Sequence, residues 1–354
     1  MMTLKGALED PACVIALRSG IAVHTRRGRR GRQHGISRPI SEGLTQTMAS
    51  FRERVHRRLQ RFSDLKAEIS LQALFRQRRV TPNQVQIFEG FWGALKTEGN
   101  WDSVFGATGD RDPVFRRGIW EQWHGPSLPR LEHPAPRLPL VFSPYCTTLL
   151  HEAVGHAMEA DYLRHSPLRY RYGELVAHPE LTVMDRPDLP HFAGSMKWDD
   201  TGQSATQTTL IHRGFLVGDL DHDKGVWRRA SYRELPQIRA SNFIVDRGSQ
   251  APADWLENVP ELNYIAWIQS GNWRPGSHRV KVLTGPVFRL RGGRPVAYLP
   301  WALLEFSTLN LLARIQAVGN DFCMDPVVHW CMKKHQPVPI SMGSPSLLLE
   351  GLSS

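Results

Sequence analysis

The chain has 354 residues, of which 41% are hydrophobic and 22% are charged, and this composition is that of an ordinary globular protein. It lacks the run of ~18 apolar residues that a membrane span requires, and its N-terminus does not resemble a secretory signal. Most of the net charge of +10 lies in residues 1–60, so the nearly neutral remainder argues against a nucleic-acid partner.

The first 130 residues divide into a leader and a small folded portion. Residues 1–47 are basic and lack sustained periodicity, so we predict a disordered leader, although such a run can also bind polyanions. From Met48, apolar residues recur every three or four positions, which predicts an amphipathic helix. Two strand-like runs, 67–80 and 84–95, follow on either side of a turn. Residues 48–130 are therefore predicted to form a reduced, truncated α+β N-terminal portion.

Residues 131–354 are predicted to form a larger, β-rich domain. A strand over 138–142 leads into a helix over 147–163, and a late helix is expected over 301–318. Two hairpins are expected, one from 208–211 with 215–217 and one from 287–290 with 296–299. Because these elements lack regular βαβ alternation, we predict an α+β fold.

The helix predicted over 147–163 carries His151, Glu152 and His156. Two imidazoles from one helix can hold one zinc ion, while a neighbouring glutamate accepts a proton from water. Here the histidines are five residues apart instead of the usual four, which separates them by about 140° on an ideal helix. Both can reach one metal only if the helix is distorted or ends near His156, and Gly155 is where a distortion costs least. A motif this short also arises by chance.

The cysteines are Cys13, Cys146, Cys323 and Cys331, and they form no CxxC pair. This usage favours a reduced, cytoplasmic setting, in which an isolated cysteine is buried, catalytic or metal-bound.

The stretch from His151 to Asp161, which reads HEAVGHAMEAD, closely resembles the core motif of the TldD/PmbA family, also called modulators of DNA gyrase. The resemblance spans about 138–352 and touches 64–108 weakly. Further segments that are similar to the family occur in the same order at 197–202, 210–216, 231–232, 236–242, 317–321, 331–339 and 343–345.

The resemblance implies a zinc peptidase of the TldD type that hydrolyses small or unfolded peptides. It implies His151, His156 and Cys331 as the ligands of Zn²⁺ and Glu152 as the base. Cys323 stays open as an alternative ligand, whereas Cys146 is expected to pack as a small apolar residue. The family also implies a homodimer or a heterodimer with a PmbA-like subunit. The alternative function is a non-catalytic structural or binding subunit of a heteromeric protease.

Four further residues are weaker candidates. Glu159 could orient the imidazole of His156, and Asp161, Asp200 and Arg239 could contribute to substrate binding or loop support. Each could equally be a solvated helix residue or a turn residue. Met332 and His335 stand where the family would have glycines, so His335 could alter metal affinity.

Overall fold

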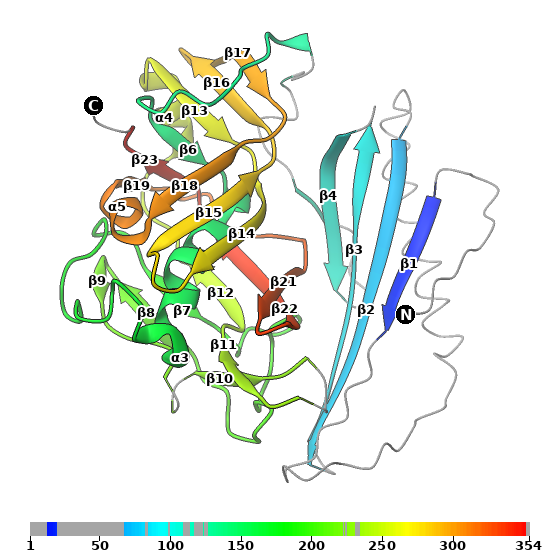
Figure 1. Ribbon diagram of the computed structural model, residues 1–354. Coiled ribbons are helices and arrows are strands. Elements are labelled where there is room, and N and C mark those ends of the chain that lie inside the picture. The colour runs from blue at the N-terminus through cyan, green and yellow to red at the C-terminus, as the bar shows by residue number, and fades with distance from the viewer. Residues whose placement is uncertain are drawn as a thin grey trace.

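The computed structural model describes the backbone of five N-terminal strands, Arg116, Trp123, and residues 127–221, 223, 225–230 and 234–351 (Figure 1). The N-terminal strands form one sheet, in which the first pair is parallel and the others are antiparallel. They are β1 (Cys13–Ser19), β2 (Ala67–Thr81), β3 (Gln84–Thr97), β4 (Asn100–Thr108) and β5 (Val114–Phe115). The strands predicted over 67–80 and 84–95 are present as β2 and β3. β1 lies in the leader, where no regular structure was expected, and the helix predicted from Met48 lies outside the described residues.

Two larger sheets form most of the C-terminal part. The six-stranded sheet contains β6 (Leu140–Phe142), β13 (Glu261–Ile265), β16 (Val287–Arg291), β17 (Arg294–Leu299), β19 (Ile315–Val318) and β23 (Leu347–Leu349). Its order is β17-β16-β13-β6-β23-β19. β6 is buried on both faces because Leu140 and Phe142 pack in one hydrophobic cluster and Val141 packs in another. The seven-stranded sheet contains β7 (Val183–Asp185), β8 (Thr208–His212), β9 (Phe215–Leu216), β12 (Asn242–Val245), β20 (Cys323–Met324), β21 (His329–Lys333) and β22 (Gln336–Ser344).

Two smaller sheets and four short α-helices complete the described part of the chain. β14 (Ile268–Arg274), β15 (Arg279–Thr284) and β18 (Leu303–Ser307) form a three-stranded sheet with β14 at one edge. β10 (Val226–Arg228) pairs with β11 (Gln237–Arg239). The helices are α2 (Thr148–Leu150), α3 (Ala160–Leu163), α4 (Pro252–Asn258) and α5 (Thr308–Ala313). None of the described helices is long and apolar enough to cross a membrane.

The prediction of a β-rich C-terminal part with few helices is confirmed, and both predicted hairpins are present. Their turns need left-handed backbone, which Gly292 and Gly293 supply in the second hairpin with φ of 52° and 72°. The reduced α+β N-terminal portion stays a prediction, because the described residues before 116 are strands alone.

Two helix predictions were wrong in detail. The segment 301–318 is not one helix but β18, α5 and β19, because Leu304 pairs with Val282 of β15 and Ile315 pairs with Leu349 of β23. Ser307 caps α5 by accepting a hydrogen bond from the amide of Asn310. The segment 147–163 is likewise not one regular helix but a succession of short helical turns, and this irregularity shapes the candidate site.

The irregular helical segment lies between β12 and β14. Its buried residues Leu149, Ala153 and Val154 belong to the main hydrophobic core, together with Phe243 of β12 and Trp273 of β14. Packing on both sides therefore stabilises the segment, because single helical turns are not stable on their own.

Candidate metal centre

The two motif histidines flank a π turn, with His151 at its first position and His156 directly after its last. The helical segment begins with α2, widens into a π turn over His151–Gly155, tightens into a 3₁₀ turn over His156–Met158 and ends with α3. In the π turn the amide of His156 donates to the carbonyl oxygen of His151. The wider turn brings both side chains to one side, where their ring centroids are 4.7 Å apart. On the π turn, the five-residue spacing therefore brings the two imidazoles together, whereas on a regular α-helix the same spacing would separate them.

Gly155 lets the π turn pack closely against β12. A Cβ atom at position 155 would lie 3.0 Å from Nδ1 of His151 and 3.1 Å from the ring of Phe243. The same Phe243 ring packs edge-on against His151, with centroids 5.3 Å apart. Phe243 and Gly155 thus fix the orientation of the His151 ring.

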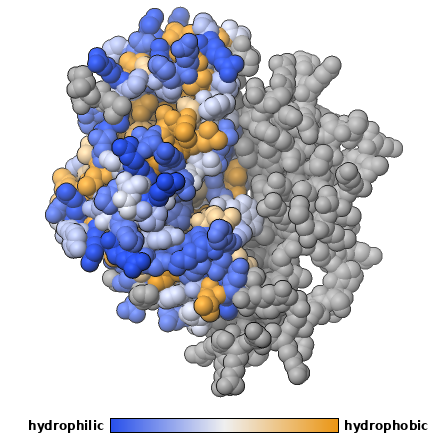
Figure 2. Space-filling view, in the orientation of Figure 1, coloured by the Kyte–Doolittle hydropathy of each residue, from blue (hydrophilic) through white to orange (hydrophobic). Residues whose placement is uncertain are grey.

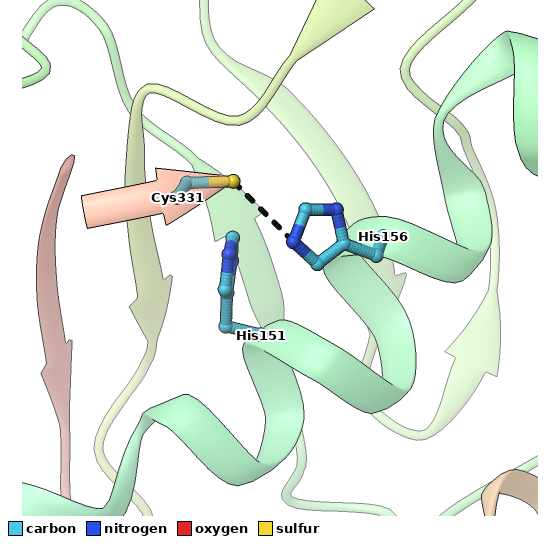
Figure 3. Close-up of side chains that lie close together, drawn as sticks. All are labelled: His151, His156 and Cys331. Carbon is cyan, nitrogen blue, oxygen red and sulfur yellow. Dashed lines mark hydrogen bonds between the residues drawn. The ribbon is translucent and has the colours of Figure 1, made fainter. Parts of the chain in front are cut away.

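Cys331 reaches the two histidines from β21. Its buried Sγ lies 3.3 Å from Nε2 of His156 (Figure 3). The donor atoms of His151, His156 and Cys331 all lie within 4.8 Å of one another, the one such group of three or more found among the described residues. Neither Cys146 nor Cys323 belongs to it, and burial raises the pKa of each of these thiols to about 12.

Positive charge around Cys331 favours its thiolate. Burial alone would raise the pKa of this thiol, but the imidazole of His156 and the guanidinium of Arg239 bring it well below its usual value. Burial would lower the pKa of His156, yet Cys331, Glu159 and Glu152 raise it well above its usual value. A thiolate is the form that binds a metal. The negative groups that favour a proton on His156 would in the same way favour a metal cation in place of that proton.

Glu152 lies beside this group with its two carboxylate oxygens in different surroundings. Oε2 accepts a hydrogen bond of 2.8 Å from the amide of Trp273. Oε1 lies 4.0 Å from Nε2 of His156. One oxygen is thus anchored, while the other is next to the candidate ligands.

Glu159 and Asp161 join His156 to a buried lysine that sequence reasoning missed. Glu159, which is fully buried, lies 3.2 Å from Nδ1 of His156 through Oε2. Nζ of Lys333 donates to Glu159 at 2.7 Å, to Asp161 at 2.6 Å and to the carbonyl oxygen of Ile238 at 2.9 Å. Burial would raise the pKa of Glu159, but His156 and Lys333 lower it to about 2. Glu159 therefore stays ionised and holds the ring of His156 with Nε2 towards Cys331.

Arg239 and Asp200, the other two weaker candidates, lie in different parts of the structure. Arg239 is fully buried and donates to the carbonyl oxygens of Cys331 and Gln336, so it supports the strand that carries Cys331. Asp200 accepts from the amide of Arg229 at 2.8 Å and does not line the cleft that contains the histidines. His335 is exposed at the turn after β21 and is not part of the three-residue group.

The arrangement fits a metal ion. Both ring nitrogens of His151 are buried and lack a hydrogen-bond partner, an expensive state for an imidazole that binds nothing. Around a tetrahedral zinc ion, with Zn–N near 2.0 Å and Zn–S near 2.3 Å, neighbouring donors lie roughly 3.3–3.6 Å apart. The separation of 3.3 Å between Sγ of Cys331 and Nε2 of His156 is already in this range, and all the donor atoms lie within 4.8 Å of one another. One thiolate and two imidazoles also leave a fourth position open, as in catalytic zinc sites.

The candidate ligands and Glu152 line a cleft of about 800 Å³. Residues of β14 and β21, including His329, form much of its lining, and Arg116 contributes as well. The face drawn in Figure 2 is predominantly hydrophilic, with apolar residues gathered in a patch in its upper half. The cleft is large enough to admit a segment of peptide.

Comparisons with known proteins agree with this picture. The family described as PmbA/TldA metallopeptidase C-terminal domain matches residues 135–354. A metalloprotease TldD homolog from Buchnera aphidicola is 29% identical over 218 residues, which are 58% of this chain and 45% of that protein. A zinc metalloprotease TldD homolog from Saccharolobus solfataricus is 23% identical over 227 residues, covering 60% of this chain and 50% of that protein.

The fold has a solved counterpart in TldE from Thermococcus kodakarensis. That structure aligns with a TM-score of 0.57 at 18% identity and covers 76% of this chain and 63% of its own. The chain spans about half the length of the curated relatives it matches. Because the family match covers more than half of the chain, the protein belongs to the PmbA/TldD metallopeptidase family.

Proposed function

We propose that this protein is a zinc-dependent peptidase in which Glu152 is the general base. The observation that carries the proposal is the position of Oε1 of Glu152, 4.0 Å from Nε2 of His156 and beside the three candidate ligands. Relatives named metalloproteases, one of them a zinc metalloprotease, support the same reading.

His151, His156 and Cys331 would hold the zinc ion. When bound, zinc would lower the pKa of its water ligand to about 7 and would polarise a peptide carbonyl. Glu152 would take the proton of the attacking water on Oε1 and deliver it to the amine that leaves. Glu159 would hold the His156 ring through Nδ1, so that Nε2 stays directed towards the metal.

Small or unfolded peptides are the substrates that the cleft suits. β14 is the edge strand of its sheet and β21 pairs with β22 alone among the described strands, and residues of both line the cleft. An edge strand can bind an extended peptide through main-chain hydrogen bonds. A folded protein cannot offer its backbone in this way, so extended chains are preferred.

Zinc content per chain tests the ligand set. We expect about one zinc ion in the wild type and in Cys323→Ser, and loss of zinc in Cys331→Ser, because the thiolate is the charged ligand. Elemental analysis of the three purified proteins makes the measurement. Well-folded wild-type protein that binds no zinc would contradict the proposal.

Glu152→Gln tests the base. The amide keeps the shape of the side chain but cannot accept the proton, so peptide cleavage should fall by about 100-fold or more while zinc remains bound. Cleavage of unfolded peptides followed by mass spectrometry provides the readout. Equal cleavage by both proteins would leave Glu152 without this role.

For the quaternary state we propose a homodimer or a heterodimer with a PmbA-like subunit, as the resemblance implies. Light scattering on the chain alone and mixed with such a subunit tests this, and a monomer under both conditions would contradict it.

A further inference from the structure

The amide that binds Glu152 belongs to an edge strand. Trp273 lies on β14, which pairs with β15 on one side only, and Trp273 is opposite Val280 in that pairing. No described strand pairs along the other edge, where the Trp273 amide donates 2.8 Å to Oε2 of Glu152. Glu152 therefore occupies one hydrogen-bonding position on this edge of β14, at Trp273.

Gly271 makes the close approach of Glu152 possible. A Cβ atom at position 271 would lie 2.5 Å from Cγ of Glu152 and 2.8 Å from Cγ2 of Thr148. Both distances are below any tolerable contact between carbon atoms. β14 cannot retreat because β15 holds it, and the helical segment is packed in the core. A side chain at 271 would therefore push the Glu152 carboxylate away from Trp273.

We propose that Gly271 and the Trp273 amide are the positioning elements for Glu152. The amide holds Oε2, which leaves Oε1 turned towards His156, and the missing side chain at 271 gives the carboxylate room to reach that amide. The kinetic part of this inference rests on the proposed function, whereas the hydrogen bond itself can be tested without any activity.

Hydrogen exchange at the Trp273 amide tests the hydrogen bond. We expect exchange to become at least about tenfold faster in Glu152→Ala, which removes the acceptor, and in Gly271→Ala, which displaces it. Glu152→Gln retains an acceptor oxygen and should keep the amide protected. Protection that is the same in the wild type, Glu152→Ala and Gly271→Ala would overturn the proposal.

Steady-state kinetics tests the positioning. Gly271→Ala should lower kcat by about tenfold to 100-fold, while KM changes less than about twofold and zinc content stays the same, because only the base moves. Gly292→Ala is the control for a strained glycine away from the cleft. It lies in the β16–β17 turn, which does not line the cleft, and an added Cβ has no neighbour within 4 Å. Its φ of 52° makes alanine strained, so this variant should lose stability but keep the wild-type kcat.

The two proposals fail in different ways. A wild-type protein without peptidase activity would contradict the proposed function, and the exchange rates of Trp273 would still decide the positioning. A Gly271→Ala protein that keeps the wild-type kcat would overturn the positioning proposal and leave the peptidase intact.

Discussion

At the scale of single residues, Gly155 couples the π turn to the orientation of His151. An alanine at 155 would place its Cβ 3.0 Å from Nδ1 of His151, and the Phe243 ring at 3.1 Å blocks the opposite shift. Gly155→Ala should therefore weaken zinc binding by about tenfold to 100-fold, the range typical of losing support for a ligand. Competition with a chromogenic chelator measures this change.

The same substitution should not unfold the protein. Gly155 has ordinary right-handed helical backbone, with φ of −53°, so alanine gains helix propensity there. The thermal midpoint of the metal-free protein should stay equal or rise. An unchanged zinc affinity would show that His151 tolerates the added methyl group.

Sequence reasoning found the residues of one local motif and named Glu159 and Arg239 as possible supports, but it missed Lys333 and Gly271. His151, Glu152 and His156 lie within six consecutive positions, and a resemblance over later segments suggested Cys331. Lys333 and Gly271 could not be found in this way, because their roles depend on contacts with residues more than 100 positions away. The alternation of a strand, which places Cys331 and Lys333 on one face, is the only local signal for Lys333.

At the scale of elements, a buried ion pair fixes the loop before β21. Nε of Arg116 donates to Asp325 at 2.9 Å, and Nε2 of His329 lies 2.8 Å from the same carboxylate. Burial would raise the pKa of Asp325, but Arg116 and His329 hold it well below its usual value. Its contribution to stability is thus present above the unfolded pKa, near 3.8, and is lost as the pH falls further.

Asp325→Asn should lower the free energy of unfolding by about 3 kcal/mol at neutral pH, because it leaves Arg116 buried without its counter-charge. The difference from the wild type should be constant between about pH 5 and 7 and shrink below about pH 4. Urea unfolding across this range measures it. A difference that persists undiminished at pH 3 would contradict the ion-pair account.

The hairpin of β21 and β22 turns through two left-handed residues, Lys334 with φ of 46° and His335 with φ of 63°. Such backbone suits glycine and is strained for other residues. His335→Gly should therefore raise the free energy of unfolding by about 0.5–1 kcal/mol, net of the added freedom of the unfolded chain. Urea unfolding measures the change, and an unaltered zinc content would agree with the exposed position of His335. A loss of zinc would instead make His335 a ligand.

Hairpins were easier to predict than the helix over 301–318. A glycine pair marks the turn of the second hairpin locally. The apolar spacing of Leu304, Leu311 and Ile315 instead fits one long helix as well as a strand, a short helix and a second strand. Pairing with β15 and β23, which the local pattern does not contain, decided between them. The π turn could not be predicted either. The spacing of the histidines required a distorted helix at the motif, but it did not specify which kind of distortion.

At the scale of the whole molecule, residues before 131 contribute to the C-terminal core. The Trp123 ring packs edge-on against Tyr264 and Phe288, with centroids 5.3 Å and 5.0 Å apart. Arg116 reaches Asp325 from the same side of the predicted boundary. Residues on both sides of the predicted boundary at 130 therefore contact one another.

A fragment of residues 112–354 should consequently fold cooperatively and bind about one zinc ion, because it retains the core, the candidate ligands and both of these contacts. A fragment of 131–354 should be less stable by at least about 3 kcal/mol, since Asp325 loses its guanidinium partner and Tyr264 and Phe288 lose an aromatic neighbour. Urea unfolding of the two fragments at one pH makes the comparison. Equal stability would mean that the domain is complete from residue 131 and that Arg116 and Trp123 only rest on its surface.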